Sequence, residues 1–218
     1  MLLKEERENI VKYCRKLIQA DLTKGTGGNI SILNREKNLF AISPSGMDYF
    51  EMEAEDVVVL DLDAKIVDGK RKPSSEFELH RIFYTKRNDI NAVVHTHSVY
   101  CTVLATNRVS LPASNYMVAL AGKDVRCAEY ASFGTMELAN NAFESMKDRN
   151  AVLLANHGLV AGSFDILNAF NIAEEIEFCA KVYVKAKTIG NPVILSDEEM
   201  ENMLEKFKTY GQKRSKNQ

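Results

Sequence analysis

Apolar positions along the chain follow two patterns, one with the spacing of a helix and one of short continuous runs. The helical spacing predicts helices over roughly 1–20, 77–87, 135–149, 165–189 and 196–210. Runs rich in Val, Ile and Thr predict strands at 29–33, 56–63, 91–99 and 151–155. Strands and helices do not alternate regularly, so the pattern predicts one α/β domain over residues 1–218 that need not be a doubly wound parallel sheet.

Small and hydroxyl-bearing residues mark where these elements begin and end. The runs GTGG at 25–28 and SPSG at 43–46 predict turns. Ser196 followed by Glu199 predicts a capping box for the last helix, and Ser75 followed by Glu78 fits the same pattern after Pro73. After the apolar stripe of the last helix the chain becomes polar and charged, so we expect a mobile C-terminal tail from about residue 207.

Composition excludes several classes of protein. The 28 basic and 30 acidic residues leave a net charge of −2, which argues against a nucleic-acid-binding protein. No apolar run approaches the ~18 residues that span a bilayer, and the N-terminus lacks the apolar segment of a secretory signal. The four cysteines lie far apart, as in proteins of a reducing compartment. We therefore expect a cytoplasmic protein without a membrane or nucleic-acid partner.

Three histidines are candidate metal ligands. His95 and His97 are two residues apart in a predicted strand, so their imidazoles point to the same face. His157 follows the predicted strand 151–155 directly, and three neutral imidazoles leave one position open, as in catalytic zinc sites. A His-x-His pair also occurs by chance, and His157 in a turn is equally able to bond a carbonyl group. The sequence alone does not show whether residues 97 and 157 meet.

The fourth histidine and the start of the helix after Pro73 have two readings. His80 lies four residues after Glu76, on the same helix face, and we expect it to pack or hydrogen-bond behind the metal ligands. Ser74 and Ser75 at a helix start are suited to bind a phosphate, although a capping box alone would explain Ser75. Neither a Walker motif nor a G-x-G-x-x-G motif is present, which disfavours nucleotide binding.

The order of the motifs is more specific than any one of them. GTGGNISI, SPSG, PSSE, VVHTHSVYCTVLA, NYMVALAG, ASFGT and NHGL follow one another, and the chain closes with LSDEEMENMLEKFKTYG. Together they resemble the class II aldolase/adducin family, from about residue 25 to Gly211. The resemblance implies a three-layer α/β/α fold with a mixed, mostly antiparallel sheet. It also implies a homotetramer of fourfold symmetry with active sites at the subunit interfaces.

The resemblance also assigns roles to individual residues. It implies one zinc ion per subunit, held by His95, His97 and His157 and, when substrate is absent, also by Glu76. Glu76 would also be the catalytic carboxylate, and Tyr116, from a neighbouring subunit, would donate a proton to the aldehyde oxygen. The substrate phosphate would be held by Gly28, Asn29, Ser45, Gly46, Ser74 and Ser75. The aldehyde pocket would contain Phe133, Phe207 and Tyr210.

The activity implied is reversible cleavage of L-fuculose 1-phosphate, or a related ketose 1-phosphate, to dihydroxyacetone phosphate and L-lactaldehyde or another short aldehyde. Three alternatives stay open. A methylthioribulose-1-phosphate dehydratase keeps the same zinc ligands. A pentulose-phosphate 4-epimerase is disfavoured, because Asn115 stands where an aspartate is expected and no histidine follows His157. A non-enzymatic, adducin-like role would not need the three histidines and the glutamate.

Overall fold

The computed structural model describes residues 1–209 of the chain. Its α-helices are α1 (Lys4–Gln19), α2 (Phe77–Lys86), α3 (Val99–Thr106), α4 (Met136–Ser145), α5 (Ile166–Lys187) and α6 (Asp197–Thr209). Its strands are β1 (Asn29–Asn34), β2 (Leu39–Ile42), β3 (Val58–Asp61), β4 (Ile66–Asp68), β5 (Ala92–Thr96), β6 (Cys127–Ala128), β7 (Ala151–Leu154) and β8 (Gly158–Ser163). Two short 3₁₀ helices are η1 (Ala54–Asp56) and η2 (Tyr116–Leu120).

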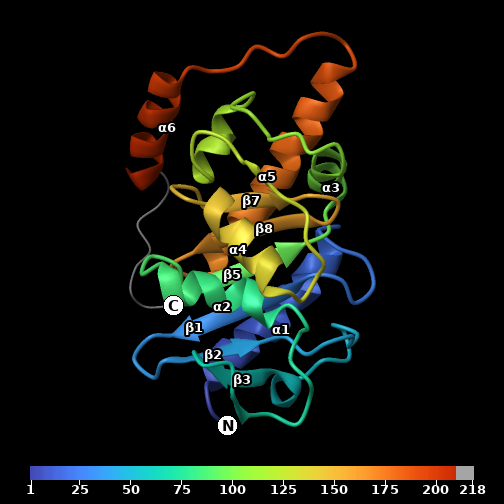
Figure 1. The fold of residues 1–218 in the computed structure, drawn as a ribbon, viewed down its shortest axis with the longest axis vertical. Helices are drawn as coiled ribbons and strands as arrows, with labels where there is room; N and C mark the ends of the chain where they lie inside the picture. Colours follow the sequence, from blue (N-terminus) through green and yellow to red (C-terminus); the bar gives the residue numbers. More distant parts are fainter. Residues whose placement is uncertain (210–218) are drawn as a thin grey trace.

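All eight strands join one sheet in the order β4-β3-β2-β1-β5-β8-β7-β6 (Figure 1). Every neighbouring pair is antiparallel except β6 and β7, which are parallel. The centre of the sheet brings together segments that are distant in sequence, because β5 pairs with β1 on one side and with β8 on the other. Asn29 lies opposite His95 across the first pair, and Val160 lies opposite it across the second.

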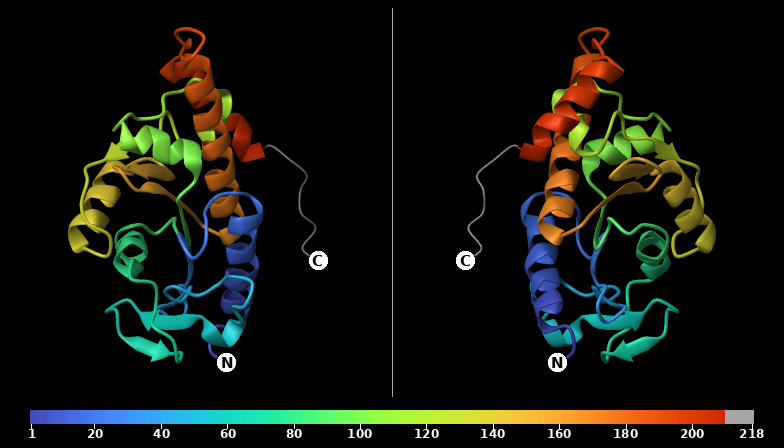
Figure 2. Two further views of the ribbon diagram at one scale, coloured as in Figure 1. Left: turned by 90° about the vertical axis from the view of Figure 1, so that its right-hand side faces the viewer. Right: turned by 90° about the vertical axis from the view of Figure 1, so that its left-hand side faces the viewer.

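Helices cover both faces of the sheet (Figure 2). One apolar core includes Ile10 of α1 and Ile176 of α5, and the other includes Phe83 of α2 and Ala139 of α4. Alternation along the strands divides their residues between the two cores; Val94 faces the first and Val93 the second. This is the expected three-layer α/β/α fold with a mixed, mostly antiparallel sheet, and residues such as His95 share the α2 face with Val93.

The strongly patterned elements lie where the sequence predicts them, and four strands and one α-helix were missed. These are β2, β4, β6, β8 and α3. The strand predicted at 91–99 ends at Thr96, and α3 begins at Val99, so His97 lies just beyond the strand. Ser196 does cap α6, because its hydroxyl accepts a hydrogen bond from the Glu199 amide at 3.2 Å. Within the described residues no helix is long and apolar enough to cross a membrane.

The capping box expected at Ser75 and Glu78 is wrong. The N-cap of α2 is Glu76, and its side chain makes no capping hydrogen bond. The Ser74 hydroxyl instead accepts from the Glu76 amide at 3.2 Å, and Glu78 pairs with Arg81. A capping box therefore does not explain Ser75.

Candidate active site

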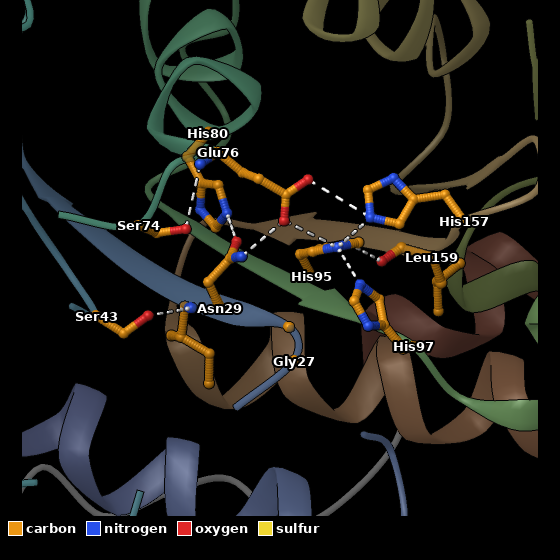
Figure 3. Close-up of polar contacts among 12 residues, drawn as sticks. Gly27, Asn29, Ser43, Ser74, Glu76, His80, His95, His97, His157 and Leu159 are labelled. Carbon is orange, nitrogen blue, oxygen red and sulfur yellow. Dashed lines mark hydrogen bonds and ion pairs between the residues drawn. The ribbon is translucent and has the colours of Figure 1, made fainter. Parts of the chain in front are cut away.

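Three imidazoles converge at the centre of the sheet (Figure 3). His95 lies on β5, His97 directly after it, and His157 in the turn between β7 and β8. The Nε2 atom of His95 lies 3.0 Å from Nε2 of His97 and 3.2 Å from Nε2 of His157. The meeting of residues 97 and 157, left open by the sequence, follows from the pairing of β5 with β8.

Glu76 completes this cluster from the opposite side. It precedes α2, and the ligand atoms of the four residues all lie within 4.8 Å of one another. Its Oε2 lies 3.3 Å from Nε2 of His95, and its Oε1 lies 3.5 Å from Nε2 of His157. Burial raises the pKa of Glu76, but the adjacent His95 and His157 outweigh burial and hold that pKa well below its ordinary value. The carboxylate is therefore ionised near neutral pH.

The donor set fits a metal cation. Nδ1 of His95 faces the Leu159 carbonyl oxygen at 2.9 Å and must donate to it, so Nε2 is the nitrogen turned toward the cluster. Burial lowers the pKa of His95, but the adjacent Glu76 outweighs burial and raises that pKa, so a metal cation bound at Nε2 would displace a proton. Burial lowers the pKa of His97 to about 4 and that of His157 to about 3, which keeps both rings neutral. Glu76 Oε1 is buried without a hydrogen-bond partner in the described part of the chain. Imidazole nitrogens and a carboxylate oxygen around one point are the ligands of a catalytic zinc ion.

An open cavity of about 380 Å³ leads to this cluster. Its walls include all six residues expected to hold a phosphate: Gly28, Asn29, Ser45, Gly46, Ser74 and Ser75. Gly28 and Gly46 have φ of 69° and 67°, so these turns adopt a backbone conformation that favours glycine. Among the described residues 1–209, none that lines this cavity is Lys or Arg. An anion here would depend on backbone N–H groups, hydroxyls and the start of α2.

Close backbone approaches explain two other glycines around the cluster. A Cβ on Gly27 would lie 2.8 Å from Nδ1 of His97, and one on Gly158 would lie 2.1 Å from the Thr96 carbonyl oxygen. Either contact would displace His97 or the strand before it. The GTGG turn and the Gly after His157 therefore leave the space that the imidazoles occupy.

The remaining predicted residues are only partly brought to the cavity. Phe133 lines it, together with Tyr130, which the sequence analysis missed although it lies three residues before Phe133. Tyr116 begins η2, is not among the lining residues, and stacks on Phe207 of α6 with ring centroids 6.3 Å apart. Tyr210 lies outside the described residues. Asn115 caps η2 by accepting a hydrogen bond from the Met117 amide.

His80 is not a member of the metal cluster. Its two ring nitrogens bond Ser31 and Asn29, and Asn29 in turn bonds Glu76. The expectation that His80 hydrogen-bonds behind the metal ligands is confirmed. Ser31 and Tyr84, which extend this chain of contacts, were missed by the sequence analysis; their only signal is their spacing, two residues after Asn29 and four after His80.

Known proteins resemble this chain in sequence and in fold. The family model of the class II aldolase and adducin N-terminal domain matches residues 8–184, so the chain belongs to that family. It is 58% identical to the 5-deoxy-D-ribulose 1-phosphate aldolase of Bacillus thuringiensis serovar kurstaki, over 97% of this chain and 100% of that protein. It is 41% identical to the L-fuculose phosphate aldolase of Escherichia coli K12, over 93% of this chain and 94% of that protein.

A solved structure of an L-fuculose 1-phosphate aldolase superimposes with a TM-score of 0.94. It is 57% identical to this chain and covers 95% of it, while this chain covers 98% of that structure. A 5-methylthioribulose-1-phosphate/5-deoxyribulose-1-phosphate aldolase of Rhodospirillum rubrum is 41% identical, over 94% of this chain and 92% of that protein. The chain is therefore a class II aldolase, a lyase of a family in which metal dependence is typical.

Proposed function

We propose that the protein is a zinc-dependent aldolase that reversibly cleaves a ketose 1-phosphate to dihydroxyacetone phosphate and a short aldehyde. One observation carries this proposal: the cluster of Glu76 and three histidines opens into a cavity lined by backbone turns and hydroxyls suited to a phosphate. The cavity volume of about 380 Å³ is within the range of small-ligand sites.

The residues around the cavity divide the chemistry between them. Hydroxyls and backbone N–H groups hold the phosphate end of the substrate, and Glu76 moves the proton at the carbon of the dihydroxyacetone phosphate fragment. A zinc ion bound by His95, His97 and His157 would supply the positive charge that stabilises the enediolate left by C–C cleavage. Tyr116 takes the hydroxyl proton as the aldehyde forms and returns it in the reverse reaction.

Our first choice of substrate is 5-deoxyribulose 1-phosphate, whose cleavage yields acetaldehyde. The support is the identity of 58% to an aldolase of this ketose phosphate, against 41% to an L-fuculose phosphate aldolase. This reverses the order expected from the sequence, which placed L-fuculose 1-phosphate and L-lactaldehyde first. L-fuculose 1-phosphate and 5-methylthioribulose 1-phosphate are the second candidates, since relatives that act on them are 41% identical.

We further propose that the enzyme is a homotetramer with one zinc ion per subunit and active sites shared between subunits. The exposure of Tyr116, 52% in a single chain, supports a role at a neighbouring cavity rather than at its own. The four cysteines are free and three of them are buried, which supports a reducing compartment such as the cytoplasm. We also propose that the segment after Thr209, which includes Tyr210, covers the aldehyde end of the bound substrate.

A panel of phosphorylated ketoses tests the proposed reaction. Purified zinc-loaded protein is incubated with each of the three ketose 1-phosphates, and dihydroxyacetone phosphate is measured over time. We expect release from all three, fastest from 5-deoxyribulose 1-phosphate. Loss of water from 5-methylthioribulose 1-phosphate without dihydroxyacetone phosphate would identify a dehydratase instead. Failure to bind zinc, together with no turnover of any member of the panel, would favour the adducin-like role.

A further inference from the structure

A continuous chain of side-chain hydrogen bonds connects the interior of the α2 layer to Glu76. Glu76, His80 and Tyr84 follow one another at intervals of four residues and face the sheet together. Asn29 and Ser31, two residues apart on β1, face them. The contacts run from Tyr84 to Ser31, to His80, to Asn29 and to Glu76, and all five residues are at most 6% exposed.

The Glu76 carboxylate, at the end of this series of hydrogen bonds, fixes which group donates in each of them. Ionised Glu76 only accepts, so Asn29 turns Nδ2 toward Oε2 of Glu76, at 2.9 Å. Oδ1 of Asn29 then faces Nε2 of His80, which must carry the ring proton and donate it. Nδ1 of His80 is consequently an acceptor, and the Ser31 hydroxyl donates to it at 2.6 Å. The Ser31 oxygen is left to accept from the Tyr84 hydroxyl.

We propose that His80 is a positioning residue that locks the orientation of the Asn29 amide, so that its N–H groups and not its oxygen face the active-site carboxylate. An amide turned by half a rotation would place Oδ1 beside the Glu76 carboxylate, and two acceptors would repel each other. The Nε2–H group of His80 prevents this turn because it satisfies Oδ1 only in the observed orientation. Burial lowers the pKa of His80 to about 3, so the ring stays neutral and keeps one donor and one acceptor nitrogen.

The fixed orientation of Asn29 gives the two oxygens of Glu76 different hydrogen-bonding environments. Oε2 is held by Asn29, whereas Oε1 is buried without a hydrogen-bond partner among the described residues and is free for the metal or a proton. The chain does not transfer protons toward Glu76, because the Asn29 amide that interrupts it is not a carrier. Its effect is to orient the carboxylate, as hydrogen-bond partners of metal ligands do elsewhere.

Two substitutions of His80 distinguish its hydrogen bond to Asn29 from its contribution to packing. The amide nitrogen of His80→Gln reaches the place of Nε2 and still donates to Asn29, whereas the shorter His80→Asn reaches only the place of Nδ1. Both are polar and neutral. The inference rests on the proposed metal site, so the readout is equilibrium transfer of zinc from the loaded enzyme to a chelating dye, without substrate.

We expect His80→Asn to bind zinc about 10-fold or more weakly, and His80→Gln to stay near the wild type. Thermal unfolding of the metal-free variants controls for the fold. Equal zinc affinity of the two variants, whether normal or reduced, would overturn the lock. Because no substrate is present, an enzyme that cleaves none of the ketose phosphates would disprove the proposed reaction and still leave this comparison valid.

A second pair keeps the test open if His80→Asn does not fold. Ser31→Ala removes the hydroxyl that donates to Nδ1 of His80 and holds the ring in place, and Ser43→Ala removes an equally buried hydroxyl that bonds the Ile30 amide instead. We expect weaker zinc binding in Ser31→Ala than in Ser43→Ala. If the two serine variants bind zinc with equal affinity, the orientation of Asn29 does not depend on the hydrogen bond between Ser31 and His80.

Discussion

At the scale of single residues, the three imidazoles are not equivalent, and His97 is the best one to remove. His95 is fully buried and bonds the Leu159 carbonyl, so its loss would also disturb the sheet. His97 lies beyond the end of β5 at the cavity wall. We expect His97→Ala to lose most of its zinc and its aldolase activity while circular dichroism stays native. Equal zinc content in variant and wild type, by metal analysis after dialysis, would disprove the ligand assignment.

Two glutamates on the same helix turn allow a matched test of the proton carrier. Glu76→Gln keeps the size of the side chain and removes its basicity, so we expect turnover to fall by about 10²-fold or more. Glu78→Gln breaks the ion pair with Arg81, which lies outside the cavity, and should leave turnover unchanged. The measurement is hydrogen exchange at the enediolate carbon of dihydroxyacetone phosphate. Wild-type exchange in Glu76→Gln would exclude it as the base.

The residues of the site were more predictable than their partners. His95 and His97 are recognisable as a pair because alternation along a strand is local information. His157 needed the pairing of β5 with β8, which no local pattern encodes. Ser31 and Tyr84 were missed because a buried hydroxyl in a strand and a tyrosine in a helix look like ordinary core residues until the two layers are packed.

At the scale of elements, the missed strands and helix have physical reasons. The strand β4 has three residues, of which two are exposed, so it carries no apolar pattern. The strand β8 contains Gly158 and Gly162, which are unfavourable in strands but leave room for Thr96 and Ile90. The helix α3 begins in a run of Val and Thr, and its N-terminal amides at Tyr100 and Cys101 bond the distant Glu177 instead of a local cap.

The packing of α6 on η2 predicts that Phe207 positions Tyr116, whereas the sequence placed Phe207 at the start of a mobile tail. Phe207 belongs to α6, packs against the core and stacks on Tyr116. We expect Phe207→Ala to lower C–C cleavage on the order of tenfold or more, because a misplaced Tyr116 no longer meets the hydroxyl proton. Zinc content and proton exchange on dihydroxyacetone phosphate should be retained.

Phe143→Ala is the matched control for Phe207→Ala. It removes a partly buried ring from another aromatic pair, with Phe83, whose centroids are 6.2 Å apart. Phe143 belongs to α4 and does not line the cavity. Equal loss of cleavage in both variants would mean that Phe207 matters only for stability.

At the scale of the whole molecule, the cavity assembles residues that no single segment contains. Its phosphate-binding candidates come from the turn before β1 and the first residue of β1, from the turn after β2 and from the start of α2. The isolated Pro44–Pro73 bridge and the hydrogen bond from the Ser74 amide to the Ser43 carbonyl hold the last two together. Each segment alone reads as a common Gly- or Ser-containing turn. Their order in the sequence was informative only through the family resemblance.

The assembled molecule also allows a test of whether each active site is shared between two subunits. Tyr116 does not line its own cavity and stacks on Phe207 instead. If it serves a neighbouring cavity, subunits that carry Glu76→Gln and subunits that carry Tyr116→Phe should be nearly inactive alone and complementary together. In a ring where each cavity takes its tyrosine from the next subunit, random mixing leaves about one cavity in four with both residues intact.

We therefore expect the two variants, co-expressed with different tags and purified through both, to recover roughly a quarter of wild-type cleavage. Mixing the separately purified proteins without subunit exchange is the control and should recover nothing. If the co-expressed assembly stays as inactive as its parents, Tyr116 serves the cavity of its own chain. In that case η2 and α6 would have to move toward that cavity before C–C cleavage.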